Sequence, residues 1–451
     1  MRSAKFIEGS ILRHILVMSS TAAMGISAVF VVDLIDMFFL SFLNDVRIVS
    51  GVGFATTISF FTISIGIGLS IALGALMSRA VGEHDWDKAK RILINSSVVT
   101  ALVALLMACI VLSLVPSLLS LIGANGKTAS YAASYLYILV PSMPIICLNM
   151  SLSGALRAVG DAKLSMYSTL VGAVVNFVLD PLLIFVLDMG IEGAAIASVA
   201  ARVAAFAVSV YGVFYKHQLW SSFSPLSLRQ DFRAIATIAV PAMLTNVATP
   251  FGNAFVTKAI ADFGDSYVAG FAIIGRITPV AFGMIFALSG AIGPIVGQNY
   301  GAGLLVRLRE TLTRSLQFCV AYVVAISALL LLLQDYLIGM FDMEGDAASL
   351  IQFFCTWLAV FFSFNGALFV ANACFNNLGK PRFSMYFNIG KATLGTIPFV
   401  IVGANWGGAY GVLFGQALGS VLFATLGVLS AYRLINEITV GQQLSINQRK
   451  R

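Results

Sequence analysis

Long apolar runs separated by short polar connections make up most of the chain. A transmembrane helix needs about 20 mostly apolar residues, and twelve runs reach that length. They are 15–43, 48–76, 93–118, 130–155, 163–187, 191–215, 234–260, 266–292, 312–334, 347–375, 383–403 and 407–432. The pattern predicts an all-α polytopic membrane protein with twelve transmembrane helices.

The charged residues set the orientation of these spans. Alternate ends hold 21 of the 27 Lys and Arg residues, including Arg2, Lys450 and Arg451 near the termini, whereas the opposite ends carry mostly acids such as Asp188 and Glu344. Cytoplasmic loops carry the excess of Lys and Arg in membrane proteins. Both termini are therefore expected in the cytoplasm. The net charge of +7 follows from this topology and requires no nucleic-acid partner.

Composition excludes several other classes of protein. The chain is 59% hydrophobic and only 10% charged, with a mean hydropathy of +0.94, whereas soluble domains carry roughly 25% charged residues. The five cysteines form no close-spaced pair, and all three histidines fall at span ends or in loops. No metal, cofactor or histidine proton relay is expected. The sequence also lacks a P-loop pattern, so ATP is not the expected energy source.

The two halves of the chain resemble each other. The stretch "GALRAVGDAKLSMYSTLVGAVVNF" (154–177) aligns with "ACFNNLGKPRFSMYFNIGKATLGT" (373–396), and "VGFA" (52–55) with "AGFA" (269–272). The shift spans six helices, so the halves are expected to form two pseudo-symmetric six-helix lobes around a cleft, related by an axis along the membrane normal. The predicted domains are an N-lobe (1–214), a cytoplasmic linker (215–233), a C-lobe (234–433) and a cytoplasmic tail (434–451).

Acidic residues inside the apolar runs are the strongest candidates for chemistry. "VVDLIDMFFL" (31–40) contains Asp33 and Asp36, and the fifth span contains Asp180. A carboxylate at the bilayer centre costs at least about 2.5–3.5 kcal/mol, so such residues usually serve a function. Asp36 and Asp180 are predicted at the same depth, and Asn176 shares a helical face with Asp180 by i, i+4 spacing. This group could hold a proton or a monovalent cation such as Na⁺. Asp33 could instead face a water-filled vestibule.

The repeat indicates that these acids belong to one lobe only. On the "VGFA"/"AGFA" register Asp36 corresponds to Asn253, an amide, and Asp180 falls opposite the apolar "IPFV" (397–400). The acids are therefore interpreted as functional residues of the first lobe and not as residues that only hold its helices together. The deep basic residues are Arg202, Arg276 and Lys391.

Several stretches resemble the multidrug and toxic compound extrusion (MATE) family, and within it the DinF-like branch. They are "VVDLIDMFFLSFLND" (31–45), "LRAVGDAK" (156–163), "NFVLDPLLIF" (176–185), "GIEGAAIAS" (190–198) and "VGQNYGA" (296–302). The resemblance implies an outward-facing V of two lobes, and a cation-coupling network of Asp36, Asn176, Asp180 and Ser198. Tyr135, Asn149 and Arg276 match further family positions. Together with Asp33 and Met150 they are predicted to contact substrate.

The function predicted from these observations is secondary active multidrug efflux. The protein is expected to act as a monomer in the bacterial inner membrane, to contact lipids, and to export amphipathic, often cationic compounds in exchange for H⁺ or Na⁺. The alternative is a flippase for lipid-linked sugars, which needs basic residues to hold a pyrophosphate. An intramembrane enzyme is not expected. One departure from the family concerns span 1, where Thr21 replaces a proline, so that a bend would have to use Gly25.

Overall fold

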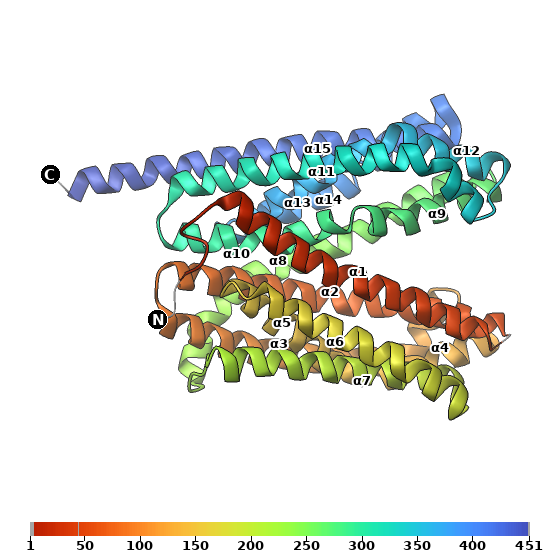
Figure 1. The fold of residues 1–451 in the computed structure, drawn as a ribbon, viewed down its shortest axis with the longest axis horizontal. Coiled ribbons are helices and arrows are strands. Elements are labelled where there is room, and N and C mark those ends of the chain that lie inside the picture. Colours follow the sequence, from red (N-terminus) through yellow and green to blue (C-terminus); the bar gives the residue numbers. More distant parts are fainter. Residues whose placement is uncertain (1–3, 44, 450–451) are drawn as a thin grey trace. The chain divides into compact units, whose positions relative to one another are not determined.

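In the computed structural model, residues 4–43 and 45–449 are described, and these contain helices and no strand (Figure 1). Arg2, Lys450 and Arg451, which contribute to the predicted orientation, lie outside them. The first eight α-helices are α1 (Ile11–Ser41), α2 (Val46–Gly82), α3 (Trp86–Leu121), α4 (Gly126–Leu139), α5 (Met143–Ala158), α6 (Ala162–Pro181), α7 (Gly190–Val210) and α8 (Pro225–Ala261). The others are α9 (Asp265–Ala281), α10 (Gly283–Gly301), α11 (Leu305–Met340), α12 (Gly345–Phe353), α13 (Phe362–Asn377), α14 (Pro381–Ala392) and α15 (Ile397–Arg449).

Short π and 3₁₀ turns continue some of these helices. They are η1 (Val140–Ser142), η2 (Leu182–Val186), η3 (Tyr211–Lys216), η4 (Phe354–Leu358) and η5 (Ala359–Phe361).

The helix lengths agree with the predicted spans. In the described part of the chain, ten helical stretches are long and apolar enough to cross a membrane, and the pair α9–α10, bent by 47°, adds an eleventh. The stretch Pro381–Gln442 covers both of the last two predicted spans, 383–403 and 407–432. With that stretch counted as two, the described helices account for twelve spans, and the predicted all-α fold is confirmed.

The turn between the last two spans lies inside α15. The helical backbone breaks at Gly407 and Gly408, and Gly408 adopts a φ of 58°, which favours glycine. On either side of this break, glycines press against backbone of the opposite arm: Gly403 against Gly411, and Gly419 against Gly395. Small residues let helices approach this closely where no hydrophobic effect drives them together.

The chain divides into two compact units. The first comprises Met24–Met243 with the N-terminal residues up to Lys5, and the second comprises Phe6–Ala23 and Leu244–Arg451. Residues of α1 and of α8 are thus shared between the units. The domain boundaries predicted from the sequence remain predictions.

In the first unit, small residues bring α6 and α7 together. A Cβ atom at Gly172 of α6 would lie 3.1 Å from the carbonyl oxygen of Ala201 and 3.2 Å from the Cβ of Ala205, both on α7. The buried side chains of Ala55, Ala104 and other small and branched residues form a core shared by α2, α3, α4 and α5. The close packing fixes α6, which carries two of the candidate site residues.

Asp161 fixes the start of α6. Its carboxylate accepts a hydrogen bond from the backbone N–H of Leu164 at 3.3 Å, as an N-cap residue does. It also lies 2.8 Å from Nζ of Lys216 and 2.8 Å from Nε2 of His217, at the end of η3. The contact with His217, and then that with Lys216, hold the pKa of Asp161 well below its usual range. A charged contact therefore joins the start of α6 to the end of η3, which continues α7.

In the second unit, the segment before α1 is tied to α10 and α11. The backbone N–H of Phe6 donates to Oε1 of Gln298 at 2.9 Å, and Asn299 donates to the Phe6 carbonyl at 3.1 Å. The guanidinium of Arg307 donates to the carbonyls of Phe6 and Gly9, each at 3.1 Å. These bonds satisfy backbone groups of a segment that has no regular structure of its own.

Candidate functional site

Asp36, Asn176 and Asp180, here called the acid cluster, meet in the first unit. The side-chain nitrogen of Asn176 donates to Oδ1 of Asp36 at 3.0 Å and to Oδ2 of Asp180 at 2.8 Å. One amide thus bridges two carboxyl groups, one from α1 and one from α6. The sequence places Asn176 and Asp180 on one helical face and predicts Asp36 at the same depth, and in the structure Asn176 bonds to both acids.

Local structure fixes the end of α6 beside the acid cluster. Pro181 directly follows Asp180, and the helix continues as the π turn η2, closed by a 3.0 Å bond from Leu187 N–H to the Leu182 carbonyl. The start of α7 packs on this turn, because a Cβ at Gly193 would lie 2.8 Å from the Leu183 carbonyl. π turns of this kind are often found at functional sites.

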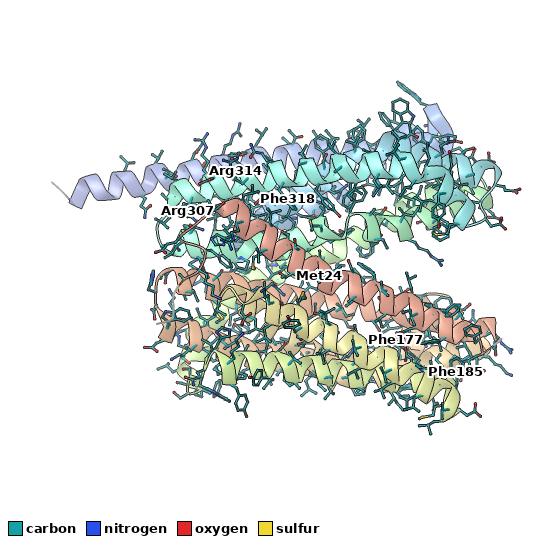
Figure 2. The ribbon with its side chains drawn as sticks, viewed as in Figure 1. Met24, Phe177, Phe185, Arg307, Arg314 and Phe318 are labelled. Atoms are coloured by element: carbon teal, nitrogen blue, oxygen red, sulfur yellow. The ribbon has the colours of Figure 1, made fainter. Side chains whose placement is uncertain are left out.

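Aromatic side chains hold α1 against the same end of α6. Phe39 of α1 packs against Phe177 with ring centroids 6.4 Å apart, and against Phe185 edge-to-face at 6.1 Å. Figure 2 shows Phe177 on α6 and Phe185 on the turn that follows it. Phe39 lies within one turn of Asp36 and Phe177 within one turn of Asn176 and Asp180 along the chain, so their contact sets the spacing between the helices that carry the acids.

Burial makes this arrangement costly unless it serves a purpose. Asp180 is fully buried and Asn176 is only 5% exposed. Oδ1 of Asp180 has no hydrogen-bond partner among the protein groups described. A buried polar atom without a partner is rare in folded proteins and calls for an explanation. A proton on one carboxyl group, or a cation between the oxygens, would supply it.

The chemistry of the acid cluster follows from its charges. Asp36 and Asp180 interact electrostatically through their side chains, and two neighbouring carboxylates cannot both ionise cheaply away from water. The pair can therefore exchange a proton, or it can offer carboxylate and amide oxygens to a monovalent cation. Among the described residues, no group of three or more His, Cys, Asp or Glu side chains could hold a metal ion.

Tyr135 and Ser198 lie beside the acid cluster. The side chain of Tyr135 on α4 hydrogen-bonds to Ser198 of α7 and interacts electrostatically with both acids. It also packs on the apolar cluster around Ile184. Asp33, one turn before Asp36 on α1, is exposed and interacts with Asp36 only through its charge. The roles predicted for these residues stay predictions.

Three other predicted substrate contacts lie elsewhere in the fold. Asn149 belongs to a separate polar cluster, in which its Oδ1 accepts from Ser168 at 3.0 Å and from Ser209 at 2.6 Å. Met150 packs its sulfur near Gly66 of α2. Arg276 lies on α9 of the second unit and is exposed. The structure gives none of these three a contact with the acid cluster.

Arg202, a deep basic residue, has a structural contact that its sequence position does not reveal. Its guanidinium donates to the Leu139 carbonyl at 3.2 Å and to Oγ of Ser142 at 2.8 Å. These acceptors belong to the break between α4 and α5, where η1 leaves backbone carbonyls without helical partners. Arg202 therefore hydrogen-bonds to groups on both sides of η1 and links α7 to the break between α4 and α5.

The chain was compared with known proteins. The MatE family model matches residues 22–182 and again 241–402, which together cover more than half of the chain. The FAD transporter of Shewanella oneidensis is 25% identical over 94% of this chain and 95% of its own length. The multidrug export protein MepA of Staphylococcus aureus is 22% identical over 90% of each chain. The crystal structure of a mutant of the Vibrio cholerae MATE transporter VcmN has a TM-score of 0.90 at 24% identity, covering 95% of this chain and 97% of that one. The chain belongs to the MatE family of membrane transporters, which are not enzymes.

Proposed function

We propose that this transporter is a secondary active exporter, which exchanges its substrate for H⁺ or Na⁺ at the acid cluster. The observation that carries the proposal is the bridge from Asn176 to both Asp36 and Asp180, with Asp180 fully buried. A purely structural role does not account for two acids at this position, because apolar side chains would pack the helices at a lower free-energy cost.

The exchange requires two states with different affinities. In a state open to the outside, H⁺ or Na⁺ reaches Asp36 and Asp180 and neutralises them, and a positively charged substrate is released. In a state open to the inside, substrate displaces the ion. A ligand that bound both states equally would shift neither, so the coupling equals the difference in its affinity between them.

The proposed substrates are amphipathic compounds, often cationic. A site with two carboxyl groups attracts positive charge, and the similarity to the multidrug export protein MepA supports this class. The name of the Shewanella relative supports a second candidate, the export of flavin dinucleotide. The flippase alternative has less support, because Arg202, one of its three deep basic residues, is bonded to the α4–α5 break.

The proposal includes a location and a topology. The protein would lie as a monomer in the inner membrane of a bacterium, in contact with lipids, with both termini in the cytoplasm. Reporter fusions at Asp188 and Arg229 test this, because the loop after η2 should report the periplasm and the start of α8 the cytoplasm. The same compartment at both positions would exclude the proposed topology.

The deciding experiment is transport by the purified protein in proteoliposomes. A pH gradient and a Na⁺ gradient are imposed separately, and movement of a fluorescent cation such as ethidium is followed. Gradient-dependent movement with one ion identifies the coupling ion. Movement that is the same with and without either gradient would rule out secondary active exchange.

A further inference from the structure

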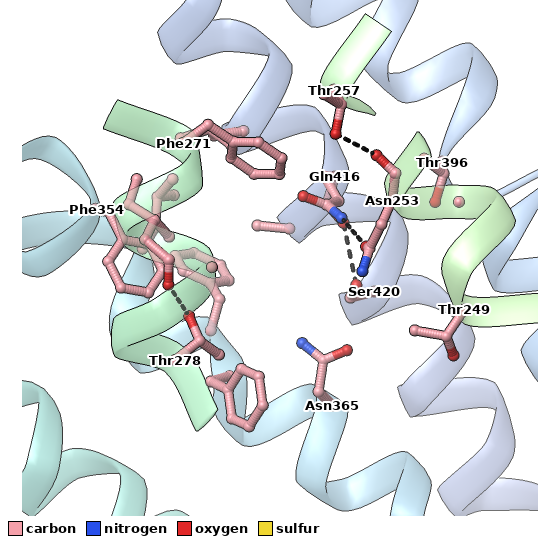
Figure 3. A pocket seen from close by; sticks show the side chains of 18 of the residues that line it. Thr249, Asn253, Thr257, Phe271, Thr278, Phe354, Asn365, Thr396, Gln416 and Ser420 are labelled. Carbon is pink, nitrogen blue, oxygen red and sulfur yellow. Dashed lines mark hydrogen bonds between the residues drawn. The ribbon is translucent and has the colours of Figure 1, made fainter. Parts of the chain in front are cut away.

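A cavity of about 480 Å³ lies inside the second unit, away from the acid cluster in sequence (Figure 3). Its size falls within the range of small-molecule sites. Helices α8, α9, α10, α13, α14 and α15 contribute to it, together with the η4 and η5 turns.

Phenylalanine side chains form one part of the cavity wall. Phe271, Phe286, Phe354, Phe361, Phe362 and Phe369 all line it. Their rings are held in place by one another: Phe362 stacks on Phe282 with centroids 4.5 Å apart, and Phe286 lies 5.5 Å from Phe362 and 5.7 Å from Phe369. A preformed aromatic surface of this kind binds planar rings by offset-stacked or edge-to-face contacts.

The opposite part of the cavity is polar. Asn253 of α8 and Gln416 of α15 face each other there, with Nε2 of Gln416 3.4 Å from Oδ1 of Asn253, and Asn365 lies nearby on α13 (Figure 3). Asn253 is the residue that corresponds to Asp36 in the sequence repeat. The second half thus has a neutral amide where the first half has an acid.

Lys391 gives this cavity a positive charge. Among the described residues that line it, Lys391 is the one with an ionisable side chain, and none carries a carboxylate. Nζ donates to Oδ1 of Asn365, and the Lys391 carbonyl accepts a 2.8 Å bond from Thr396. These contacts fix the ammonium group at the wall but supply no opposite charge.

An anionic ligand would stabilise this arrangement. A charged group inside an apolar segment is costly unless it is paired or reaches water. An ammonium group has three donors, and the bond to Asn365 uses one of them. A carboxylate or phosphate beside Lys391 would accept from the others and neutralise the charge.

We infer that the cavity of the second unit binds planar aromatic compounds that carry a negative charge. The rings lie against the phenylalanines, the anionic group pairs with Lys391, and Asn253 and Gln416 bond polar edges of the ring system. This gives the second candidate substrate, flavin dinucleotide, and similar anionic compounds a binding place separate from the acid cluster. Its physiological meaning rests on the proposed export function, but binding does not.

The test is equilibrium binding to the full chain in detergent, with no gradient. Flavin mononucleotide and riboflavin share one ring system and differ by a phosphate, so the pair isolates the anionic contact. Quenching of flavin fluorescence reports binding. The variants are Lys391→Gln and, as a control with the same loss of charge, Lys258→Gln, because Lys258 is exposed on α8 and does not line the cavity.

The wild-type protein is expected to bind flavin mononucleotide about tenfold more tightly than riboflavin. Lys391→Gln should remove that preference, a loss of about 1.4 kcal/mol, and leave riboflavin binding unchanged, which also shows that the variant is folded. Lys258→Gln should keep the preference. Should Lys391→Gln fail to fold, Lys391→Arg retains the charge and should keep the preference, while Phe286→Ala should weaken both flavins alike.

Two results would overturn the inference. One is equal binding of the two flavins by the wild-type protein, and the other is an unchanged preference in Lys391→Gln. Failure of ethidium export in proteoliposomes would instead count against the proposed function and would leave these binding results standing.

Discussion

Replacing Asp36 by asparagine removes one of the two titratable groups from the acid cluster with little change in shape. The Oδ1 atom of the new side chain can still accept from Asn176, as the carboxylate does at 3.0 Å. A neutral hydrogen bond contributes about 0.5–1.5 kcal/mol net, against roughly 1.5–3 kcal/mol for one to a charged group. The loss in stability should therefore be about 1 kcal/mol, and the protein should fold.

The effect on transport should be much larger than the effect on folding. Moving one elementary charge through 100 mV provides about 2.3 kcal/mol, and every 1.4 kcal/mol changes a concentration ratio tenfold. If Asp36 carries one coupled charge in each cycle, its loss lowers the substrate gradient that 100 mV can sustain by roughly 50-fold.

The assay is accumulation of ethidium in proteoliposomes under an imposed pH or Na⁺ gradient with a membrane potential. Asp33→Asn serves as the control, because Asp33 lies one turn away on the same helix and is exposed. We expect Asp36→Asn to show passive exchange only, and Asp33→Asn to keep most of the gradient. An Asp36→Asn protein that accumulates substrate as the wild type does would refute the coupling mechanism.

Three further predictions follow from contacts described above. Asp180→Asn should abolish gradient-driven accumulation nearly as fully as Asp36→Asn, measured in the same vesicles; normal accumulation would exclude a paired site. Since the folded-state pKa of Asp161 lies below its unfolded value of about 3.9, its contribution to stability is present at pH 7 and is lost as the pH falls through the folded-state pKa. Asp161→Asn should therefore lower the melting temperature at pH 7, and the difference should shrink below about pH 4; a gap that stays constant would contradict this. Gly419→Ala should destabilise the protein by about 1–3 kcal/mol through overpacking, whereas Gly441→Ala, in open space on the same helix, should be neutral or stabilising by up to about 1 kcal/mol, which thermal unfolding in detergent can measure.

Much of the fold could be predicted because the apolar runs are long and the charges between them are regular. The breaks inside the apolar runs could not be predicted. The eighth predicted span, 266–292, reads as continuous, but the structure divides it at Phe282 into α9 and α10 with a 47° bend. The eleventh, 383–403, is interrupted between Ala392 and Ile397. Both breaks lie beside the cavity of the second unit and depend on tertiary packing, which no hydropathy pattern records.

The candidate site shows the same limit. Spacing within one helix placed Asn176 and Asp180 together, because a helix repeats every 3.6 residues. That Asn176 also bonds Asp36, 140 residues away in sequence, depends on how α1 and α6 pack. Lys391 stood out as a charge in an apolar run, but its aromatic neighbours come from separate helices, and only the fold gathers them.

The glycine contacts within α15 also set how this part of the protein can move. Gly395, just before α15, and Gly403, Gly411 and Gly419 within it stand at steps of eight residues on the two arms, and a Cβ atom at Gly403, Gly411 or Gly419 would meet backbone of the opposite arm. If one arm slid along the other by a single residue, a larger side chain would enter a space that only a hydrogen atom fits. The two arms therefore cannot slide along each other, and we expect them to move together as one rigid body. The bend at Phe282 lies outside this locked pair, so it is the place where we expect the second unit to rearrange, beside Phe286 and the other phenylalanines that line the cavity.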